Sequence, residues 1–198
     1  MNIVNVGYDS TNYYVIEQNR TRLLVDAGWP GTLPKLLACL KRKGLTLQDV
    51  PYLFVTHYHP DHAGLVQELK DKGIKHIVLE EQVPAIPLLK THVKPDSGYV
   101  DIRVQDSFRL TLAQSRAWLK NIGLAGEMIS TPGHSDDSIS LVLDEGLAFT
   151  GDLLFPMAGQ DDAVAILEQS WDRLRNLKVR TIYPGHGPIR PIPELLQS

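Results

Sequence analysis

Four metal-capable side chains cluster between positions 57 and 62, in a motif of the form His-x-His-x-Asp-His. They are His57, His59, Asp61 and His62. In an extended segment, His57 and His59 point to the same face because successive side chains alternate, so both imidazoles can hold one cation. Pro60 ends strand pairing, and the chain can then turn Asp61 and His62 toward a neighbouring position. Imidazole and carboxylate without thiolate suit Zn²⁺ first, with Fe, Mn or Co as alternatives, and disfavour Ca²⁺ and Mg²⁺.

Three further metal-capable side chains follow β-prone segments, each directly after a glycine. They are His134, Asp152 and His186. Each alone is a weak signal, but the repeated position at the end of a strand predicts that they share one site with the first cluster. The remaining two of the chain's 7 histidines, His76 and His92, have no such setting, and we expect neither to take part in the chemistry.

Apolar spacing and turn residues indicate the elements that must position these side chains. We expect strands at residues 3–6, 13–16, 21–26, 52–55, 76–79, 127–131, 138–143, 147–150 and 181–183, and helices at 33–43, 63–72, 111–121 and 163–177. The segment from 81 to about 108 is broken by prolines and shows no clear pattern. Strands come in a block, then helices, then strands and helices again, which favours a mixed layered sheet with helices packed outside.

Length and composition are typical of one globular domain, residues 1–198, with 43% hydrophobic and 22% charged residues. The net charge of −3 lacks the basic excess of a nucleic-acid binder. A single cysteine, Cys39, excludes an intramolecular disulfide framework, and the first residues do not resemble a secretory leader. No run approaches the roughly 18–20 apolar residues of a membrane span. We therefore expect a cytoplasmic protein with a small-molecule substrate and no nucleic-acid or membrane partner; its oligomeric state is not indicated.

The motifs above, together with the strand at 24–28 that carries Asp26, resemble the metallo-β-lactamase superfamily, in the branch of hydroxyacylglutathione hydrolase (glyoxalase II). They occur in the superfamily's order and cover essentially the whole chain. The resemblance implies an α+β fold, a four-layer αββα sandwich in a single domain, with the site at one edge of the two sheets. It also implies two divalent metal ions, one held by His57, His59 and His134, the other by Asp61, His62 and His186, with Asp152 bridging.

The chemistry implied by the resemblance is hydrolysis of a small thioester or ester. Two cations, Zn²⁺ first and Fe or Mn as alternatives, generate a hydroxide near neutral pH. Asp61 is then the catalytic residue that protonates the leaving group, unless a water on the metal does so. Asp26 has two interpretations: it orients a metal-binding histidine, or it caps the turn before Gly28, and the resemblance favours the first.

Several other functions share parts of this motif set. A lactonase of the acyl-homoserine lactone type is the close alternative, followed by a mononuclear-iron persulfide dioxygenase and a phosphodiesterase. A glutathione thioesterase is less expected because only residues 188–198 follow His186, and a β-lactamase is less expected because those enzymes lack the equivalent of Asp152. A degraded, non-catalytic site is disfavoured because every ligand position is intact. We expect the loops at 29–33, 81–108 and 155–161 to determine specificity.

Overall fold

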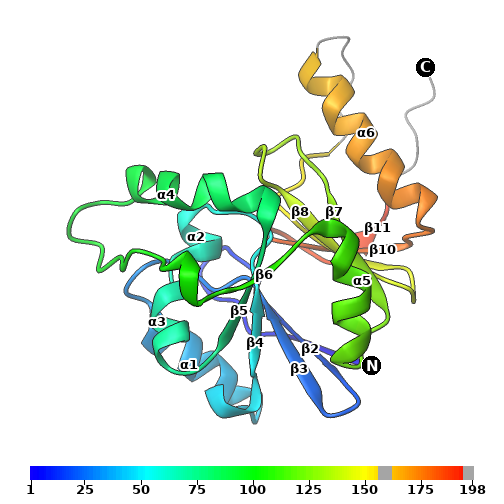
Figure 1. The fold of residues 1–198 in the computed structure, drawn as a ribbon. Coiled ribbons are helices and arrows are strands. Elements are labelled where there is room, and N and C mark those ends of the chain that lie inside the picture. The colour runs from blue at the N-terminus through cyan, green and yellow to red at the C-terminus, as the bar shows by residue number, and fades with distance from the viewer. Residues whose placement is uncertain (156–161, 194–198) are drawn as a thin grey trace.

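The computed structural model describes residues 1–155 and 162–193, which form two stacked β-sheets with helices outside them (Figure 1). In spatial order, the six-stranded sheet consists of β1 (Asn2–Asn5), β2 (Tyr14–Gln18), β3 (Thr21–Val25), β4 (Tyr52–Phe54), β5 (Lys75–Leu79) and β6 (Phe108–Leu110). The five-stranded sheet consists of β11 (Arg190–Pro191), β10 (Thr181–Pro184), β9 (Leu147–Gly151), β8 (Ile139–Leu143) and β7 (Gly126–Ser130). The helices are α1 (Leu33–Arg42), α2 (Pro60–Ala63), α3 (Val66–Asp71), α4 (Ile86–Leu89), α5 (Leu112–Asn121) and α6 (Asp162–Asn176).

Strand direction brings the loops that carry the site to one edge of each sheet. β1, β2 and β3 form an antiparallel meander, after which β3, β4, β5 and β6 are parallel. In the second sheet β7, β8 and β9 are antiparallel, whereas β9 and β10 are parallel. The carboxyl ends of parallel neighbours meet at the same edge of a sheet. The loops after β3 and β4 therefore lie together, as do the loops after β9 and β10.

Alternation of side chains along the strands builds three apolar layers. In β3, Leu24 packs with the residues of α1 and α3, whereas Leu23 packs between the two sheets. In β8, Leu141 belongs to the layer between the sheets, whereas Val142 packs against Trp171 of α6. Each sheet is thus buried on both faces, with helices on the outer face of each. The four-layer αββα sandwich predicted from the resemblance is confirmed.

The structure differs from the predicted elements where local patterns were weak. The single helix predicted at 63–72 is two helices, because α2 ends at Ala63 and α3 begins at Val66. The predicted strand at 21–26 ends one residue earlier, because Asp26 has a left-handed φ of 63° and leaves the strand. The proline-broken segment contains α4 and short 3₁₀ helices, followed by β6, which was not predicted. β11 was not predicted either.

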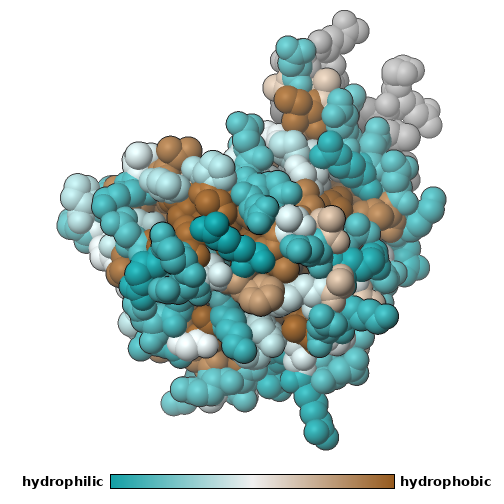
Figure 2. All heavy atoms as spheres, in the orientation of Figure 1, coloured by the Kyte–Doolittle hydropathy of each residue, from teal (hydrophilic) through white to brown (hydrophobic). Residues whose placement is uncertain are grey.

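Among the helices in the described residues, none combines the length and apolar character that a membrane crossing requires. Figure 2 shows that the face seen in Figure 1 is largely hydrophilic, with hydrophobic residues gathered around α4.

Candidate metal centre

All seven residues predicted to bind metal lie in loops or short helices that follow strand ends. His57 and His59 follow β4, Asp61 and His62 lie in α2, His134 follows β7, Asp152 follows β9 and His186 follows β10. α2 begins at Pro60 directly after His59, whose backbone is still extended with φ −94° and ψ 156°. The extended segment therefore directs His57 and His59 toward one group of candidate ligands, and the helix that follows it directs Asp61 and His62 toward a second, neighbouring group.

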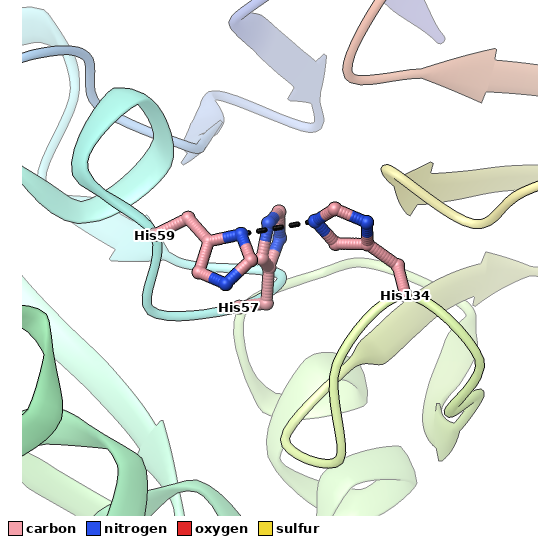
Figure 3. A group of neighbouring side chains, drawn as sticks. All are labelled: His57, His59 and His134. Atoms are coloured by element: carbon pink, nitrogen blue, oxygen red, sulfur yellow. Dashed lines mark hydrogen bonds between the residues drawn. The ribbon is translucent and has the colours of Figure 1, made fainter. Parts of the chain in front are cut away.

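His57, His59 and His134 form the first group of neighbouring side chains. Figure 3 shows the three imidazoles turned toward one another, two from the loop after β4 and one from the loop after β7. His59 Nδ1 lies 2.9 Å from His134 Nε2. One ring nitrogen from each of the three lies within 4.8 Å of the others. Three imidazoles at this spacing can bind one cation from one side.

Asp61, His62, Asp152 and His186 form the second group, and their ligand atoms also lie within 4.8 Å of one another. His62 Nε2 lies 3.4 Å from Asp61 Oδ2 and 3.2 Å from Asp152 Oδ1. His186 Nε2 lies 3.1 Å from Asp61 Oδ2 and 3.3 Å from Asp152 Oδ2. Two imidazoles and two carboxylates therefore face one small volume, a donor set that suits a divalent transition metal ion.

Asp152 lies beside both groups. In the second group its Oδ1 lies 3.2 Å from His62 Nε2 and its Oδ2 lies 3.3 Å from His186 Nε2. The same Oδ2 lies 3.6 Å from His134 Nε2 and 3.9 Å from His57 Nε2 in the first group. Asp152 therefore adjoins both groups of candidate ligands.

Three buried polar atoms of the centre fit bound metal ions. His57 Nε2, His62 Nε2 and Asp152 Oδ1 are buried and have no hydrogen-bond partner among the described residues. A buried polar atom without a partner costs about 1–3 kcal/mol. In the neutral form of the two imidazoles, each of these atoms offers a lone pair, and a cation in the centre would satisfy all three. The residues present therefore fit a metal-binding role.

A network around Asp26 sets the orientation of two of the imidazoles. Asp26 Oδ2 lies 2.8 Å from His62 Nδ1, and Asp26 Oδ1 accepts a 2.7 Å hydrogen bond from the backbone N–H of Thr56. The Thr56 hydroxyl donates to Asp26 over 2.9 Å and lies 3.1 Å from His57 Nδ1. The tautomers that satisfy this network carry their protons on Nδ1, which leaves both Nε2 atoms free to bind metal. Thr56 was not singled out from the sequence.

Two residues near the N-terminus support the second group. His186 Nδ1 donates to the Ser10 carbonyl over 2.7 Å, and the Thr11 hydroxyl donates to Asp61 Oδ2 over 3.1 Å. An isolated antiparallel bridge between Thr11 and His186 holds the two loops together. Sequence reasoning missed Ser10 and Thr11, because nothing in their local pattern shows which distant loop they meet.

Burial and neighbouring charges set the protonation of the centre. Burial lowers the pKa of His57 well below its usual value of 6.5, and the nearby histidines lower it further. Burial and His134 likewise lower the pKa of His59, so both imidazoles are neutral, the form that binds metal. Burial acts to lower the pKa of His62 as well, but Asp26 and Asp152 outweigh it and raise that pKa to about 10. The carboxylates of Asp26 and Asp152 thus favour a positive charge at the second group, whether a proton on His62 or a bound cation.

Two cavities open beside the centre, and His134 lines both. The His92 cavity, about 530 Å³, is lined by His59, Leu88, His92 and His134 among others. The Arg190 cavity, about 240 Å³, is lined by His134, Asp152, Phe155, Pro184, His186 and Arg190 among others. The His92 cavity is lined in part by the loop at 81–108, and the Arg190 cavity is lined by Phe155, the first residue of the loop at 155–161; we predicted that both loops determine specificity. Residues 156–161 lie outside the described part of the chain.

The two histidines that we expected to take no part in the chemistry have different settings. The ring centroid of His92 lies 5.9 Å from that of His59, so His92 is close to the centre although its surroundings in the sequence did not indicate this. His76 is buried and lies outside both groups. Its Nε2 lies 2.9 Å from the Tyr58 hydroxyl oxygen and its Nδ1 lies 2.8 Å from Ser107 Oγ.

The fold and the histidine–aspartate cluster at the strand ends match one class of known proteins. The sequence model of the metallo-beta-lactamase superfamily matches residues 6–186, and the chain therefore belongs to this superfamily. This confirms the resemblance stated from the motifs. The loop at 29–33, the strands β2 to β10 and all seven candidate ligands lie within the matched range.

Relatives in sequence include metallo-hydrolases. The chain is 30% identical to a probable metallo-hydrolase of Methanocaldococcus jannaschii, over 92% of this chain and 90% of that protein. It is 32% identical to hydroxyacylglutathione hydrolase of Rhodopseudomonas palustris, over 87% of this chain and 61% of that protein. It is 28% identical to a beta-lactamase-like protein 2 homolog of Caenorhabditis elegans, over 90% of this chain and 56% of that protein. The chain thus spans less than two thirds of the length of the last two.

Solved structures share the fold. The structure of the BLEG-1 B3 metallo-beta-lactamase superposes with a TM-score of 0.71 at 25% identity, over 96% of this chain and 93% of that chain. A metallo-beta-lactamase family protein of Thermus thermophilus superposes with a TM-score of 0.72 at 22% identity, over 96% of this chain and 74% of that chain.

Proposed function

We propose that the protein is a metal-dependent hydrolase that uses two divalent cations to cleave a small thioester or ester. The observation that carries this proposal is the convergence of seven histidine and aspartate side chains in two adjoining groups. Similarity to hydroxyacylglutathione hydrolase supports a thioester as the substrate class. The net charge of −3 supports a small molecule rather than a nucleic acid.

The two groups indicate which residues hold each cation. His57, His59 and His134 hold one, Asp61, His62 and His186 hold the other, and Asp152 is shared. Zn²⁺ fits this set of imidazole and carboxylate donors first, with Fe or Mn as alternatives. When bound, two such cations supply a hydroxide near neutral pH and withdraw electron density from the substrate carbonyl.

Asp61 is the residue proposed to carry a proton to the leaving group. Among the described residues, its hydrogen bond and ion pairs involve Oδ2, which faces Thr11, His62 and His186. We therefore assign to Oδ1 the step of taking the proton that the attacking water releases and passing it to the leaving group. The Asp61 side chain is only partly buried, and its neighbour His186, 3.1 Å from Oδ2, lines the Arg190 cavity.

The two cavities suit a substrate with a group on each side of its carbonyl. Since His134 lines both, a carbonyl at the centre places one arm in the His92 cavity and the other in the Arg190 cavity. Thioesters and esters have this shape.

Metal analysis together with a substrate panel tests the proposal. Protein purified without added metal is analysed by inductively coupled plasma mass spectrometry and assayed with a thioester, a lactone and a phosphodiester. We expect close to two Zn or Mn ions per chain and turnover of the thioester, with Asp152→Ala inactive in parallel. About one Fe per chain with oxygen uptake would instead identify a dioxygenase, and protein without metal affinity would reject the proposal.

A further inference from the structure

Arg190 is a partly buried cation in the wall of the Arg190 cavity, beside three of the candidate metal ligands. It begins β11, in which it pairs with Ile182 of the antiparallel strand β10. β10 leads into the loop that carries His186. The hairpin of β10 and β11 therefore fixes Arg190 relative to His186, and the guanidinium has a defined position next to the metal centre.

The guanidinium lies over an aromatic ring. Arg190 Cζ is 4.2 Å from the ring centroid of Phe155, which lines the same cavity. Stacking on a ring restrains the plane of a guanidinium and leaves its edge N–H groups available to donate hydrogen bonds. Arg190 Nε is buried and has no hydrogen-bond partner among the described residues.

Among the described residues, Arg190 differs in its charge environment from the other arginines that are partly buried. These are Arg22 and Arg175, and each forms an ion pair with a carboxylate. Within residues 1–155 and 162–193, no carboxylate forms an ion pair with Arg190. Burial of the guanidinium removes part of its hydration and lowers the pKa of Arg190. A cation withdrawn from water without a counter-charge is unfavourable, and an anionic ligand relieves this cost.

We propose that Arg190 binds a carboxylate of the substrate, so that the thioester or ester cleaved here is an acidic one. This inference rests on the proposed hydrolase function. The fork of a guanidinium matches the two oxygens of a carboxylate. Leu154 and Phe155, both about half exposed, give the cavity apolar walls that suit a methylene spacer between carboxylate and carbonyl. The cavity, about 240 Å³, is small beside the roughly 300–1,000 Å³ of common ligand sites, so the acidic arm is short.

Two thiols that differ only in charge test this inference without turnover. 3-Mercaptopropionate and 3-mercaptopropionamide have the same length, and each can bind Zn²⁺ through sulfur. Their dissociation constants are measured by isothermal titration calorimetry on zinc-loaded protein. The variants are Arg190→Met, which retains an apolar stem, and Arg190→Gln, which provides a second neutral side chain. The matched control is Arg180→Met, because Arg180 precedes β10 and donates to the Glu145 carbonyl away from the centre.

Wild-type protein and the Arg180→Met control should bind the carboxylate about 10-fold more tightly than the amide. In Arg190→Met and Arg190→Gln this preference should fall about 10-fold, with the affinity for the amide unchanged. Unchanged affinity for the amide also shows that the variants are folded.

An equal preference for the carboxylate in wild type and in either folded Arg190 variant would overturn the inference while leaving the metal centre intact. Failure of both thiols to bind zinc-loaded wild type would overturn the proposed function, and the inference with it.

Discussion

Asp26 Oδ2 lies 2.8 Å from His62 Nδ1, and the same carboxylate accepts a hydrogen bond from the hydroxyl of Thr56, which lies 3.1 Å from His57 Nδ1. One buried carboxylate therefore orients imidazoles that belong to different ligand groups. Asp26 can do this because its left-handed backbone, with φ 63°, turns the chain out of β3 at the edge where β4 ends. Partners of this kind fix the tautomer of a ligand and make it more basic.

Asp26→Asn should weaken zinc binding about 10- to 100-fold, because the amide cannot accept from both His62 and Thr56 through two anionic oxygens. Competition with a chromophoric chelator measures the affinity. Asp9→Asn is the control, since Asp9 pairs with Lys35 on the surface, and it should behave as wild type. Wild-type affinity in Asp26→Asn would show that the network does not position the ligands.

His59→Ala and Asp152→Ala should each abolish the loading of two ions per chain. Asp152→Ala should bind less metal in total than His59→Ala, because Asp152 lies beside both groups. Metal content by inductively coupled plasma mass spectrometry measures both variants. His92→Ala is the matched control, because His92 neighbours His59 but lies outside both groups. Two ions per chain in either His59→Ala or Asp152→Ala would contradict the ligand assignment.

Gly185→Ala should lower metal affinity although Gly185 is not a ligand. A Cβ at this position would collide with Asp152 Oδ1 and lie 2.6 Å from His62 Cε1, so these side chains must move. Gly187→Ala is a strict control: its φ of 77° strains the backbone, but a Cβ there meets nothing within 4 Å. The same zinc titration on both variants should show the loss in Gly185→Ala alone. An equal loss of zinc affinity in both variants would attribute the effect to backbone strain in the loop that carries His186 rather than to the collision with Asp152.

His76 should make the protein less stable as the pH falls. Burial, with a smaller effect from Lys70, lowers the pKa of His76 from 6.5 to about 3, so below pH 6.5 the unfolded chain takes up a proton that the folded chain does not. The free energy of unfolding therefore decreases as the pH falls from 6.5 toward 3. Between pH 6.5 and pH 5, wild type should lose about 2 kcal/mol more than His76→Gln. Urea denaturation at several pH values measures this, and equal pH dependence in both proteins would refute it.

The positions of the candidate ligands could be predicted because each follows a strand and adjoins a turn residue. Alternation in an extended segment indicated that His57 and His59 share a face, and Pro60 indicated the turn that follows. The periods of the apolar strands and amphipathic helices predicted a mixed layered sheet with helices outside it, whereas the four-layer αββα arrangement was implied by the resemblance to the metallo-β-lactamase superfamily.

The supporting residues could not be predicted, because their roles depend on contacts between distant segments. Ser10 and Thr11 meet the centre only through a bridge to His186, and nothing local marks them. Arg190 lies in the two-residue strand β11, too short to give a pattern. β6 lies at the edge of its sheet and begins with Phe108, which is exposed, so it lacks the buried alternation of the other strands.

Anomalous diffraction from crystals grown with Zn²⁺, recorded at the zinc absorption edge, tests the central claim most directly. We expect two anomalous peaks per chain, one enclosed by His57, His59 and His134 and the other by Asp61, His62 and His186, with Asp152 between them. A single peak, or peaks away from these side chains, would contradict the assignment of a two-metal centre.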